Sequence, residues 1–412
     1  MSAPPGRVLI IGEFGVGALA VAYARAFEAL GWQTTRYDMQ AGYTRGAVLA
    51  RARGLRRLLR PLLWSIMARE TAALAARAEL DLVLAIKAPY LGAGGLARLR
   101  GATSAPLAML YPDSPYGAYV QRRGLPAVLA RFDRVYIWSR QLLARLHADG
   151  VAAATYLPFG YDPVDYGAVG PVARPECGRR HAIAFIGQRY DKRARWLAAL
   201  RGLDVGVWGL GWEGDSTLRE SGACVHRAAA HGPAAAAIYR GATVAVNILH
   251  ADNVPAHNMR TFEIPPCRTV MLTEATVEID AFFEPGRACL TAATPEALRA
   301  QAERALGDAT QARAVAAEGA RVVVPHTYEA RARAIVADAG ACWRRVGIDD
   351  GAAAPGHAGG GGDRPLARGD RVAAGAGRAS LPAPRPRCRL WAGRVRDEAG
   401  SRVSLGPAGG RR

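Results

Sequence analysis

Short apolar runs alternate with amphipathic stretches along residues 7–339, and this pattern predicts an α/β fold. Each apolar run is followed by glycine, proline or a charged residue, as is common for strands buried in a parallel sheet. Stretches with the spacing of an amphipathic helix separate the runs. The clearest apolar runs cover residues 7–11, 82–86, 107–111, 183–186 and 205–208.

The stretch 245–274 contains one complete unit of such a sheet. Its pattern predicts a strand at 245–249, a polar loop at 250–258, a short helix ended by a proline pair, and a second strand at 270–273. The short helix is therefore expected where the chain leaves one strand and before it enters the next.

The residues of this short helix suit a nucleotide. Asn258 is a favourable N-cap residue, so free backbone N–H groups at the helix start are expected to face the loop and hold an anion such as a diphosphate. Arg260, in the first turn, can make a bidentate contact with a phosphate. Glu263 can accept hydrogen bonds from ribose hydroxyls. Phosphate and ribose together indicate a nucleotide.

The segment N-M-R-T-F-E-I-P-P-C at 258–267, followed by M-L-T-E and F-F-E-P-G, resembles the CgeB-like glycosyltransferases, a bacterial spore-maturation family. The resemblance implies a GT-B fold, in which two Rossmann-like doubly wound domains face a central cleft. It implies an enzyme that moves a hexose or related sugar from a nucleotide-sugar donor to a glycan, lipid or protein acceptor. It also implies that Glu263 binds the donor ribose and that no cofactor is needed besides this substrate.

Composition and the resemblance together predict three parts. Residues 1–162 form an acceptor domain, and residues 163–349 form a donor domain whose last helix, 328–339, braces both. Residues 350–412 form a tail, and residues 351–412 contain 14 Gly and 6 Pro among 62 residues, a composition typical of disorder. The arginine-rich tail is either a nonspecific polyanion-binding arm or an unselected extension of the reading frame.

Two positions depart from the family pattern. The related retaining enzymes carry a glutamate about two helical turns before the ribose glutamate, and residues 253–257 contain none. Arg268 replaces the glycine usual after Cys267, which calls the tight turn after the helix into question. Both departures leave the stereochemistry of transfer open. They also motivate the alternative that the chain is a non-catalytic sugar-nucleotide or glycan-binding protein of the same fold.

The strand at 183–186 leads into a second candidate phosphate site. Gly187 begins a turn, and Arg189 and Lys192 follow it at the start of a helix, which is an arrangement that binds phosphate. We therefore predict that Gly187, Arg189 and Lys192 contact the donor diphosphate. Trp212, after a glycine-rich turn, either stacks on the nucleobase or belongs to the core.

Two acidic residues in the first half are candidates for the base that activates the acceptor. Glu13 lies in the glycine-rich turn 12–17, and Asp113 follows the apolar run 107–111, where ligands bind at the carboxyl ends of parallel strands. Asp113 has an equal alternative as an organiser of a proline-flanked turn. The order G-x-x-G-x-G in 12–17 differs from the dinucleotide fingerprint, which disfavours an NAD-dependent enzyme.

The net charge of +19 does not by itself indicate a nucleic-acid partner. Only two of the 54 basic residues are lysine, and such a skew is typical of a coding bias. The basic stretch 45–64 is either a helix on an anionic membrane surface or a sheet-covering helix with a solvated arginine face. Outside the tail, the basic residues follow no nucleic-acid-binding module.

The scattered cysteines and the first residues of the chain limit the metal sites and the cellular locations that the sequence supports. No C-x-x-C or zinc-like histidine pair is present, so buried free thiols and no metal site are expected. No D-x-D motif points to a metal-dependent transferase. Residues 1–6 lead into a strand without the pattern of a signal peptide, which predicts a cytoplasmic protein, with peripheral contact at the inner membrane face left open. The six cysteines are Cys177, Cys224, Cys267, Cys289, Cys342 and Cys388.

Overall fold

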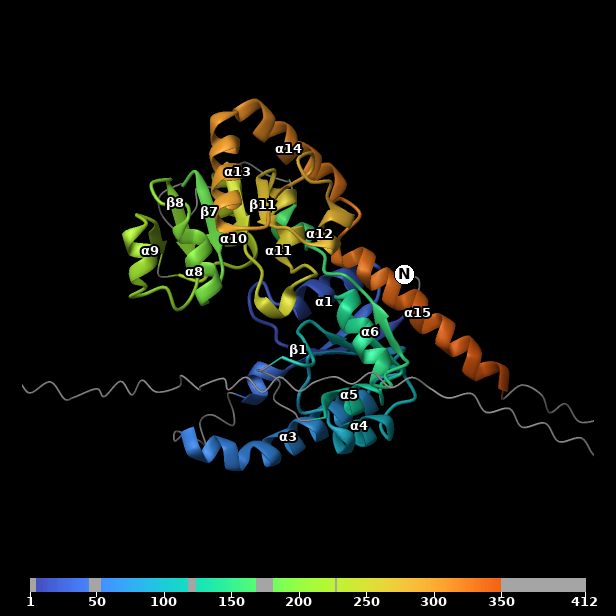
Figure 1. The fold of residues 1–412 in the computed structure, drawn as a ribbon. Coiled ribbons are helices and arrows are strands. Elements are labelled where there is room, and N and C mark those ends of the chain that lie inside the picture. The colour runs from blue at the N-terminus through green and yellow to red at the C-terminus, as the bar shows by residue number, and fades with distance from the viewer. Residues whose placement is uncertain (1–4, 44–52, 118–123, 168–180, 227, 350–412) are drawn as a thin grey trace, which may run out of the picture. The chain divides into compact units, whose positions relative to one another are not determined.

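The chain folds around two parallel six-stranded sheets, each with helices beside it (Figure 1). The computed structural model describes residues 5–43, 53–117, 124–167, 181–226 and 228–349. The predicted tail, 350–412, and the first residues of the basic stretch 45–64 lie outside this described part. The described residues belong to the compact unit 1–353.

The N-terminal sheet has the strand order β2-β1-β3-β4-β5-β6, so the order reverses between β1 and β3. Its strands are β1 (Arg7–Gly12), β2 (Gln33–Asp38), β3 (Leu82–Ile86), β4 (Leu107–Tyr111), β5 (Arg134–Ile137) and β6 (Ala154–Tyr156). The helices of this part are α1 (Leu19–Ala29), α3 (Arg53–Ala76), α4 (Ala93–Arg100), α5 (Leu125–Leu129), α6 (Arg140–Ala148) and α7 (Pro163–Tyr166).

The C-terminal sheet has the order β12-β11-β10-β7-β8-β9, which reverses between β7 and β10. Its strands are β7 (Ile183–Ile186), β8 (Val205–Trp208), β9 (Cys224–His226), β10 (Val244–Asn247), β11 (Val270–Glu274) and β12 (Leu290–Ala292). The helices are α8 (Asp191–Ala198), α9 (Ser216–Glu220), α10 (Gly232–Gly241), η1 (Ala251–Asn253), α11 (Arg260–Glu263), η2 (Pro265–Cys267), α12 (Val277–Phe282), α13 (Pro295–Gly307), α14 (Ala309–Val322) and α15 (Tyr328–Asp349).

Alternate residues of the central strands pack into different cores, which explains their unbroken apolar sequences. In β1, Val8 and Ile10 belong to a core that includes residues of α1 and α15. Leu9 and Ile11 belong to a core that includes residues of α3 and α4. Because side chains alternate between the two faces of a strand, each sheet is covered on both faces. The fold is therefore doubly wound, as the sequence predicted.

The long helix α3 contains both a glycine and a proline. It nevertheless runs without a break through Gly54 and Pro61, from Arg53 to Ala76. Pro61 is exposed, so water can take the hydrogen bond that the missing proline N–H leaves unmade.

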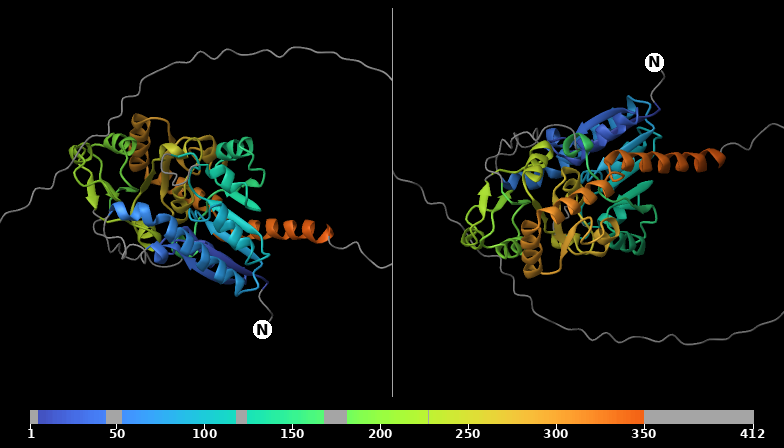
Figure 2. Two further views of the ribbon diagram at one scale, coloured as in Figure 1. Left: turned by 90° about the horizontal axis from the view of Figure 1, so that it is seen from below. Right: turned by 90° about the horizontal axis from the view of Figure 1, so that it is seen from above.

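The last helix, α15, returns to the first part of the chain and is long in every view (Figures 1 and 2). Thr327 caps its N-terminus, since Thr327 Oγ1 accepts a hydrogen bond from Ala330 N–H at 3.1 Å. Tyr328 packs on Tyr23 of α1 with 5.2 Å between ring centroids. Arg331 donates to the carbonyl oxygen of Phe159 at 3.0 Å. The domain boundary near residue 162 stays a prediction.

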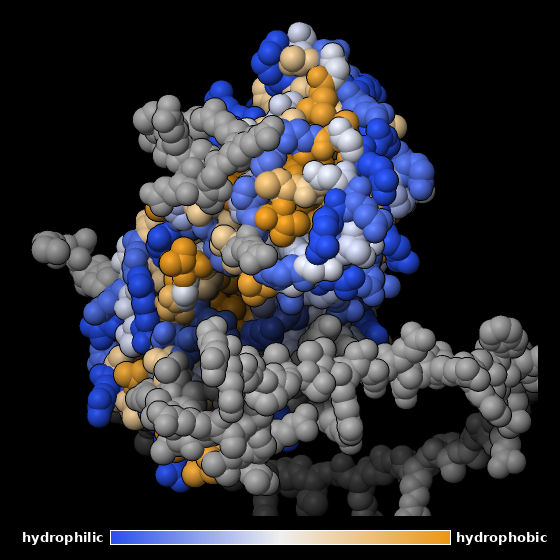
Figure 3. Space-filling view, turned by 90° about the vertical axis from the view of Figure 1, so that its left-hand side faces the viewer, coloured by the Kyte–Doolittle hydropathy of each residue, from blue (hydrophilic) through white to orange (hydrophobic). Residues whose placement is uncertain are grey.

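No helix in the described ranges combines the length and the apolar character needed to cross a membrane. The face shown in Figure 3 is mainly hydrophilic, with hydrophobic residues in small patches. In α3, Leu62 and Ile66 are among the exposed hydrophobic residues. Peripheral membrane contact through the basic stretch stays a prediction.

Arg268 keeps the tight turn after η2 in spite of its side chain. Its backbone angles, φ 57° and ψ 40°, lie in the left-handed region that glycine adopts freely. The turn that the sequence called into question is therefore formed, at the cost of a strained residue.

Replacing Arg268 by glycine is expected to stabilise the protein. A non-glycine residue in the left-handed region costs about 1–2 kcal/mol, part of which returns as greater freedom of the unfolded chain. We expect Arg268→Gly to raise the free energy of unfolding by up to about 1 kcal/mol, measured by urea denaturation. Arg195→Gly, on an exposed right-handed position within α8, is the matched control and should be destabilising. Equal effects of the two substitutions would contradict strain at Arg268.

Candidate functional site

The strand orders of both sheets reverse at the same place in the molecule. Ligands of open α/β sheets bind at such reversals, beside the carboxyl ends of the strands. A cavity of about 370 Å³ lies there, and we call it the first cavity. Its wall includes Ile86 at the end of β3 and Ile186 at the end of β7. The cavity is therefore lined by residues that follow strands of both sheets.

Arg260 and Glu263, the two ends of α11, both line the first cavity. Burial raises the pKa of the Glu263 carboxyl to about 7, although the Arg260 charge and the Tyr166 hydroxyl oppose the rise. The buried Nε of Arg260 has no hydrogen-bond partner. The site thus offers a cation with a free donor and a carboxyl group poised to titrate near neutral pH.

Asn258 fixes the entry to α11 as predicted. Its Oδ1 accepts a hydrogen bond from Thr261 N–H at 3.2 Å, and its Nδ2 donates to Asn247 Oδ1 at 2.8 Å. These side chains are buried. The Asn258 side chain already accepts a hydrogen bond from one of the N–H groups at the start of α11, and α11 is a single turn. Fewer free N–H groups therefore remain for an anion than the sequence predicted. The binding role predicted for Asn258 stays a prediction, and its observed contacts hold the turn that carries Arg260.

Glu13 and Asp113, the predicted bases, both line the first cavity. Asp113 forms an ion pair with Lys87, which follows the adjacent strand β3 and has a left-handed backbone with φ 45°. Lys87 and Asp113 also line a second cavity of about 440 Å³, together with Tyr190 and Asp252. The two cavities therefore share the Lys87–Asp113 pair.

Gly187 begins the loop after β7, and there is no room for a side chain at this position. A Cβ atom there would lie 2.9 Å from the Phe185 ring. Its carbonyl oxygen accepts a hydrogen bond from Trp212 Nε1 at 2.8 Å. Trp212 is 1 % exposed and packs in the core of the C-terminal sheet, so the second of its two predicted roles fits its position.

Arg189 and Lys192 are held by carboxylates and line neither the first nor the second cavity. Arg189 Nε donates to Asp215 Oδ2 at 3.0 Å, and Lys192 Nζ donates to Glu274 Oε1 at 2.6 Å. Glu274 is nearly buried at the end of β11. The structure thus separates these cations from Arg260, and their contact with a diphosphate stays a prediction.

Several groups beside the cavity carried no signal in the sequence. Tyr166 and Tyr239 are buried, and burial, followed for Tyr166 by the Glu263 charge, raises the pKa of Tyr166. Burial likewise raises the pKa of Tyr239, so both hydroxyls stay protonated and can donate. Arg193, also buried, donates to the carbonyl oxygens of Ile248 and Gln188. Arg193 thereby ties the loop after β7 to the end of β10.

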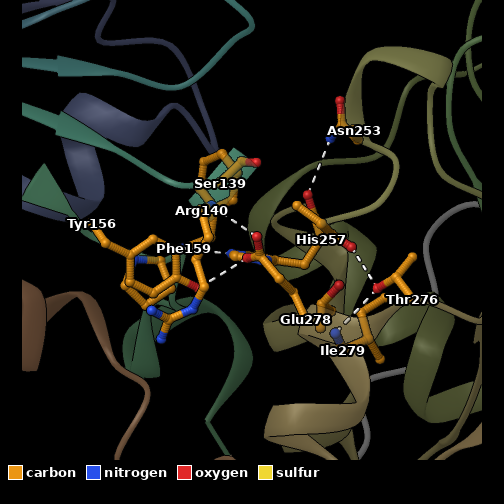
Figure 4. A network of polar contacts seen from close by, with 12 residues as sticks. Ser139, Arg140, Tyr156, Phe159, Asn253, His257, Thr276, Glu278 and Ile279 are labelled. Carbon is orange, nitrogen blue, oxygen red and sulfur yellow. Dashed lines mark hydrogen bonds and ion pairs between the residues drawn. The ribbon is translucent and has the colours of Figure 1, made fainter. Parts of the chain in front are cut away.

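A polar network around the buried Glu278 and His257 joins α12 and the loop before α11 to α6, β6 and Phe159 (Figure 4). Glu278 Oε1 accepts from Arg140 N–H at 2.8 Å, and its Oε2 accepts from the Tyr156 hydroxyl at 3.0 Å. His257 Nδ1 lies 3.1 Å from Oε2, and Phe159 N–H donates to His257 Nε2 at 3.3 Å. Because Nε2 accepts, Nδ1 carries the proton and donates to Glu278. We call Arg140, Tyr156, Phe159, His257 and Glu278 the junction network.

Comparison with known proteins agrees with this architecture. Residues 189–337 match the family model described as glycosyl transferase-like. The sucrose-phosphate synthase of Thermosynechococcus elongatus superposes with a TM-score of 0.58 at 14 % identity, covering 84 % of this chain and 100 % of that one. The fold is that of the GT-B glycosyltransferases. The family match also confirms the prediction of a glycosyltransferase-like enzyme for the segment it covers.

Two further GT-B structures have comparable similarity. The Anabaena protein HepE, solved with UDP-glucose, has a TM-score of 0.58 at 12 % identity and covers 82 % of this chain and 100 % of its own. The trehalose 6-phosphate synthase of Burkholderia multivorans has a TM-score of 0.58 at 14 % identity, with 85 % and 99 % covered. A sequence search of curated proteins finds no match.

Proposed function

We propose that this chain is a CgeB-like GT-B glycosyltransferase that binds a nucleoside diphosphate sugar in the first cavity. The observation that supports this most directly is the pairing of Arg260 and Glu263 on one helical turn in the cavity wall. The Glu263 carboxylate accepts hydrogen bonds from the ribose hydroxyls. Arg260 faces the diphosphate. The acceptor approaches from the side of Glu13 and Asp113, one of which removes its proton.

In the proposed reaction the nucleoside diphosphate leaves with increasing negative charge. Arg260 neutralises this charge. In many transferases a metal ion has this role. Tyr166 and Tyr239, whose hydroxyls stay protonated, surround Arg260 and Glu263. UDP is the first nucleotide to test, because HepE, similar in fold, binds UDP-glucose.

Nucleotide affinity is expected to depend on Glu263 and on pH. Loss of hydrogen bonds to a charged group costs about 1.5–3 kcal/mol, so Glu263→Ala should weaken UDP binding by about 10–100-fold. Because the carboxyl group has a pKa of about 7, it gains its charge as pH rises through 7. The affinity of the parent protein should therefore rise through that range relative to Glu263→Gln. Calorimetric titration with UDP, GDP, CDP, dTDP and ADP from pH 6 to 8 measures both effects.

The diphosphate itself also titrates, but its effect on affinity is the same for both proteins. Comparing the parent with Glu263→Gln therefore cancels this effect. Glu284→Gln, an exposed carboxylate on the surface, is the matched control and should leave both affinity and its pH dependence unchanged. If Glu263→Ala bound every nucleotide as tightly as the parent, the ribose assignment would be wrong. Release of nucleoside diphosphate from UDP-glucose separates an enzyme from the alternative, a non-catalytic binding protein, which would release none.

A further inference from the structure

Two histidines and a cysteine that are distant in sequence converge at one edge of the C-terminal sheet. Nε2 of His181, just before β7, lies 3.0 Å from Nε2 of His226 at the end of β9. Cys224 begins β9, and one ligand atom from each of the three residues lies within 4.8 Å of the others. The group lies outside the linings of both cavities.

The strand register explains how these residues meet. Cys224 and His226 are two positions apart on β9, so their side chains leave the same face of the strand. The intervening strand β8 has Gly206 opposite Cys224. A Cβ atom on Gly206 would lie 2.4 Å from the His181 ring, so the glycine gives this ring the space to reach across β8.

Neighbouring groups hold both imidazoles in place. His181 Nδ1 lies 2.7 Å from the Asp204 carboxylate, to which it donates, so Nε2 of the neutral ring presents its lone pair to His226. The His226 ring stacks on Trp208 with 4.3 Å between centroids and 2° between planes. A carboxylate that orients a histidine in this manner is the usual outer partner of a histidine bound to zinc.

We propose that His181 Nε2, His226 Nε2 and Cys224 Sγ bind one zinc ion or a similar borderline divalent cation. Two imidazoles and a thiolate are a ligand set that such ions prefer. Water occupies the fourth position, because Cys224 is exposed and the site is open on that side. Binding releases the thiol proton, and the His226 proton moves from Nε2 to Nδ1, so that both imidazoles bind as neutral ligands. The ion thereby ties the edge strand β9 to the start of β7.

Cobalt titration of the full-length chain, first freed of metal with a chelator, tests this site. One Co²⁺ per chain should bind with a thiolate-to-cobalt charge-transfer band and be displaced by Zn²⁺. Cys224→Ser should lose the band, and His226→Ala should weaken binding by at least about 10-fold. Cys289→Ser, a buried thiol, and His147→Ala, an exposed histidine of α6, are matched controls that should behave as the parent.

The outcomes are decisive in both directions. A band that persists unchanged in Cys224→Ser would place the thiolate ligand elsewhere and overturn the proposal, as would a parent protein that binds no Co²⁺ or Zn²⁺. Circular dichroism of the variants checks that each is folded. A Zn²⁺-dependent rise in Tm in the parent, absent in Cys224→Ser and His226→Ala, would support the site by a second measure.

Discussion

Arg260→Ala is expected to lower the turnover of a nucleotide-sugar donor by about 10²–10³-fold, the loss typical of removing one donor from a preorganised charge-stabilising site. Affinity for the nucleoside diphosphate should fall less than turnover. The reason is that charge on the diphosphate increases as the bond to the sugar breaks, so Arg260 contributes more to the transition state than to the bound donor. The Tyr239 hydroxyl bonds to the guanidinium, but its Nε has no hydrogen-bond partner and can donate in this contact.

Release of UDP from UDP-glucose measures turnover without knowledge of the acceptor, and calorimetry measures affinity. Arg268→Ala removes the same charge from the same segment at an exposed position and is the matched control. It should retain parental turnover. Weaker binding of the nucleoside diphosphate with parental turnover in Arg260→Ala would mean that Arg260 binds the ground state and transition state alike. A variant with parental turnover and parental affinity would remove Arg260 from the site.

Local sequence predicted the unit around α11 well because its signals are local. The apolar run of β10, the cap at Asn258 and the proline pair after Glu263 all act within a few residues. The strands β3, β4, β7 and β8 were also predicted at their observed bounds, since each is a short apolar run buried in a parallel sheet. Those strands set the edges at which the first cavity forms.

Contacts between elements that are far apart in the sequence could not be predicted from local sequence patterns. Lys192 and Arg189 looked like free cations, but Glu274 from β11 and Asp215 before α9 pair with them. The pKa of Glu263 depends on burial and on Tyr166, which comes from α7. No property of the sequence near each residue reports such a partner.

The edge strand β9 escaped prediction for a related reason. It covers only Cys224–His226. This strand has only three residues, and its sequence C-V-H shows neither an apolar run nor a clear alternation. Its pairing with β8 brings His226 to His181, 45 residues earlier, which spacing along the sequence does not reveal.

The junction network provides the second large effect. Each buried donor left without an acceptor costs about 1–3 kcal/mol, so Glu278→Ala is expected to lower the free energy of unfolding by about 3–5 kcal/mol. The substitution leaves three donors without an acceptor, namely Arg140 N–H, the Tyr156 hydroxyl and His257 Nδ1–H. His257 is fully buried, so water cannot replace the lost acceptor there. Glu278→Gln should recover only part of the loss, because its amide nitrogen would face a donor.

The same network makes an acid-dependent contribution to stability. Burial alone would raise the pKa of Glu278, but the hydrogen bonds from His257 and Arg140 N–H and from Tyr156 outweigh it and leave the pKa below its ordinary value. The stabilisation is therefore present above the ordinary glutamate pKa and disappears as pH falls through the lowered value. The difference in stability between the parent and Glu278→Ala should shrink on acidification.

Urea denaturation of the full-length chain at several pH values measures both parts of this prediction. Glu284→Ala is the matched control, because Glu284 pairs with Arg287 at the surface and an exposed pair contributes at most about 1 kcal/mol. A double-mutant cycle of Glu278→Ala with Tyr156→Phe should give a coupling energy of about 0.5–3 kcal/mol. If Glu278→Ala were no more destabilising than the control, the carboxylate would not hold α12 to α6 and β6, and the junction would depend on apolar packing such as Trp138 on Phe159 instead.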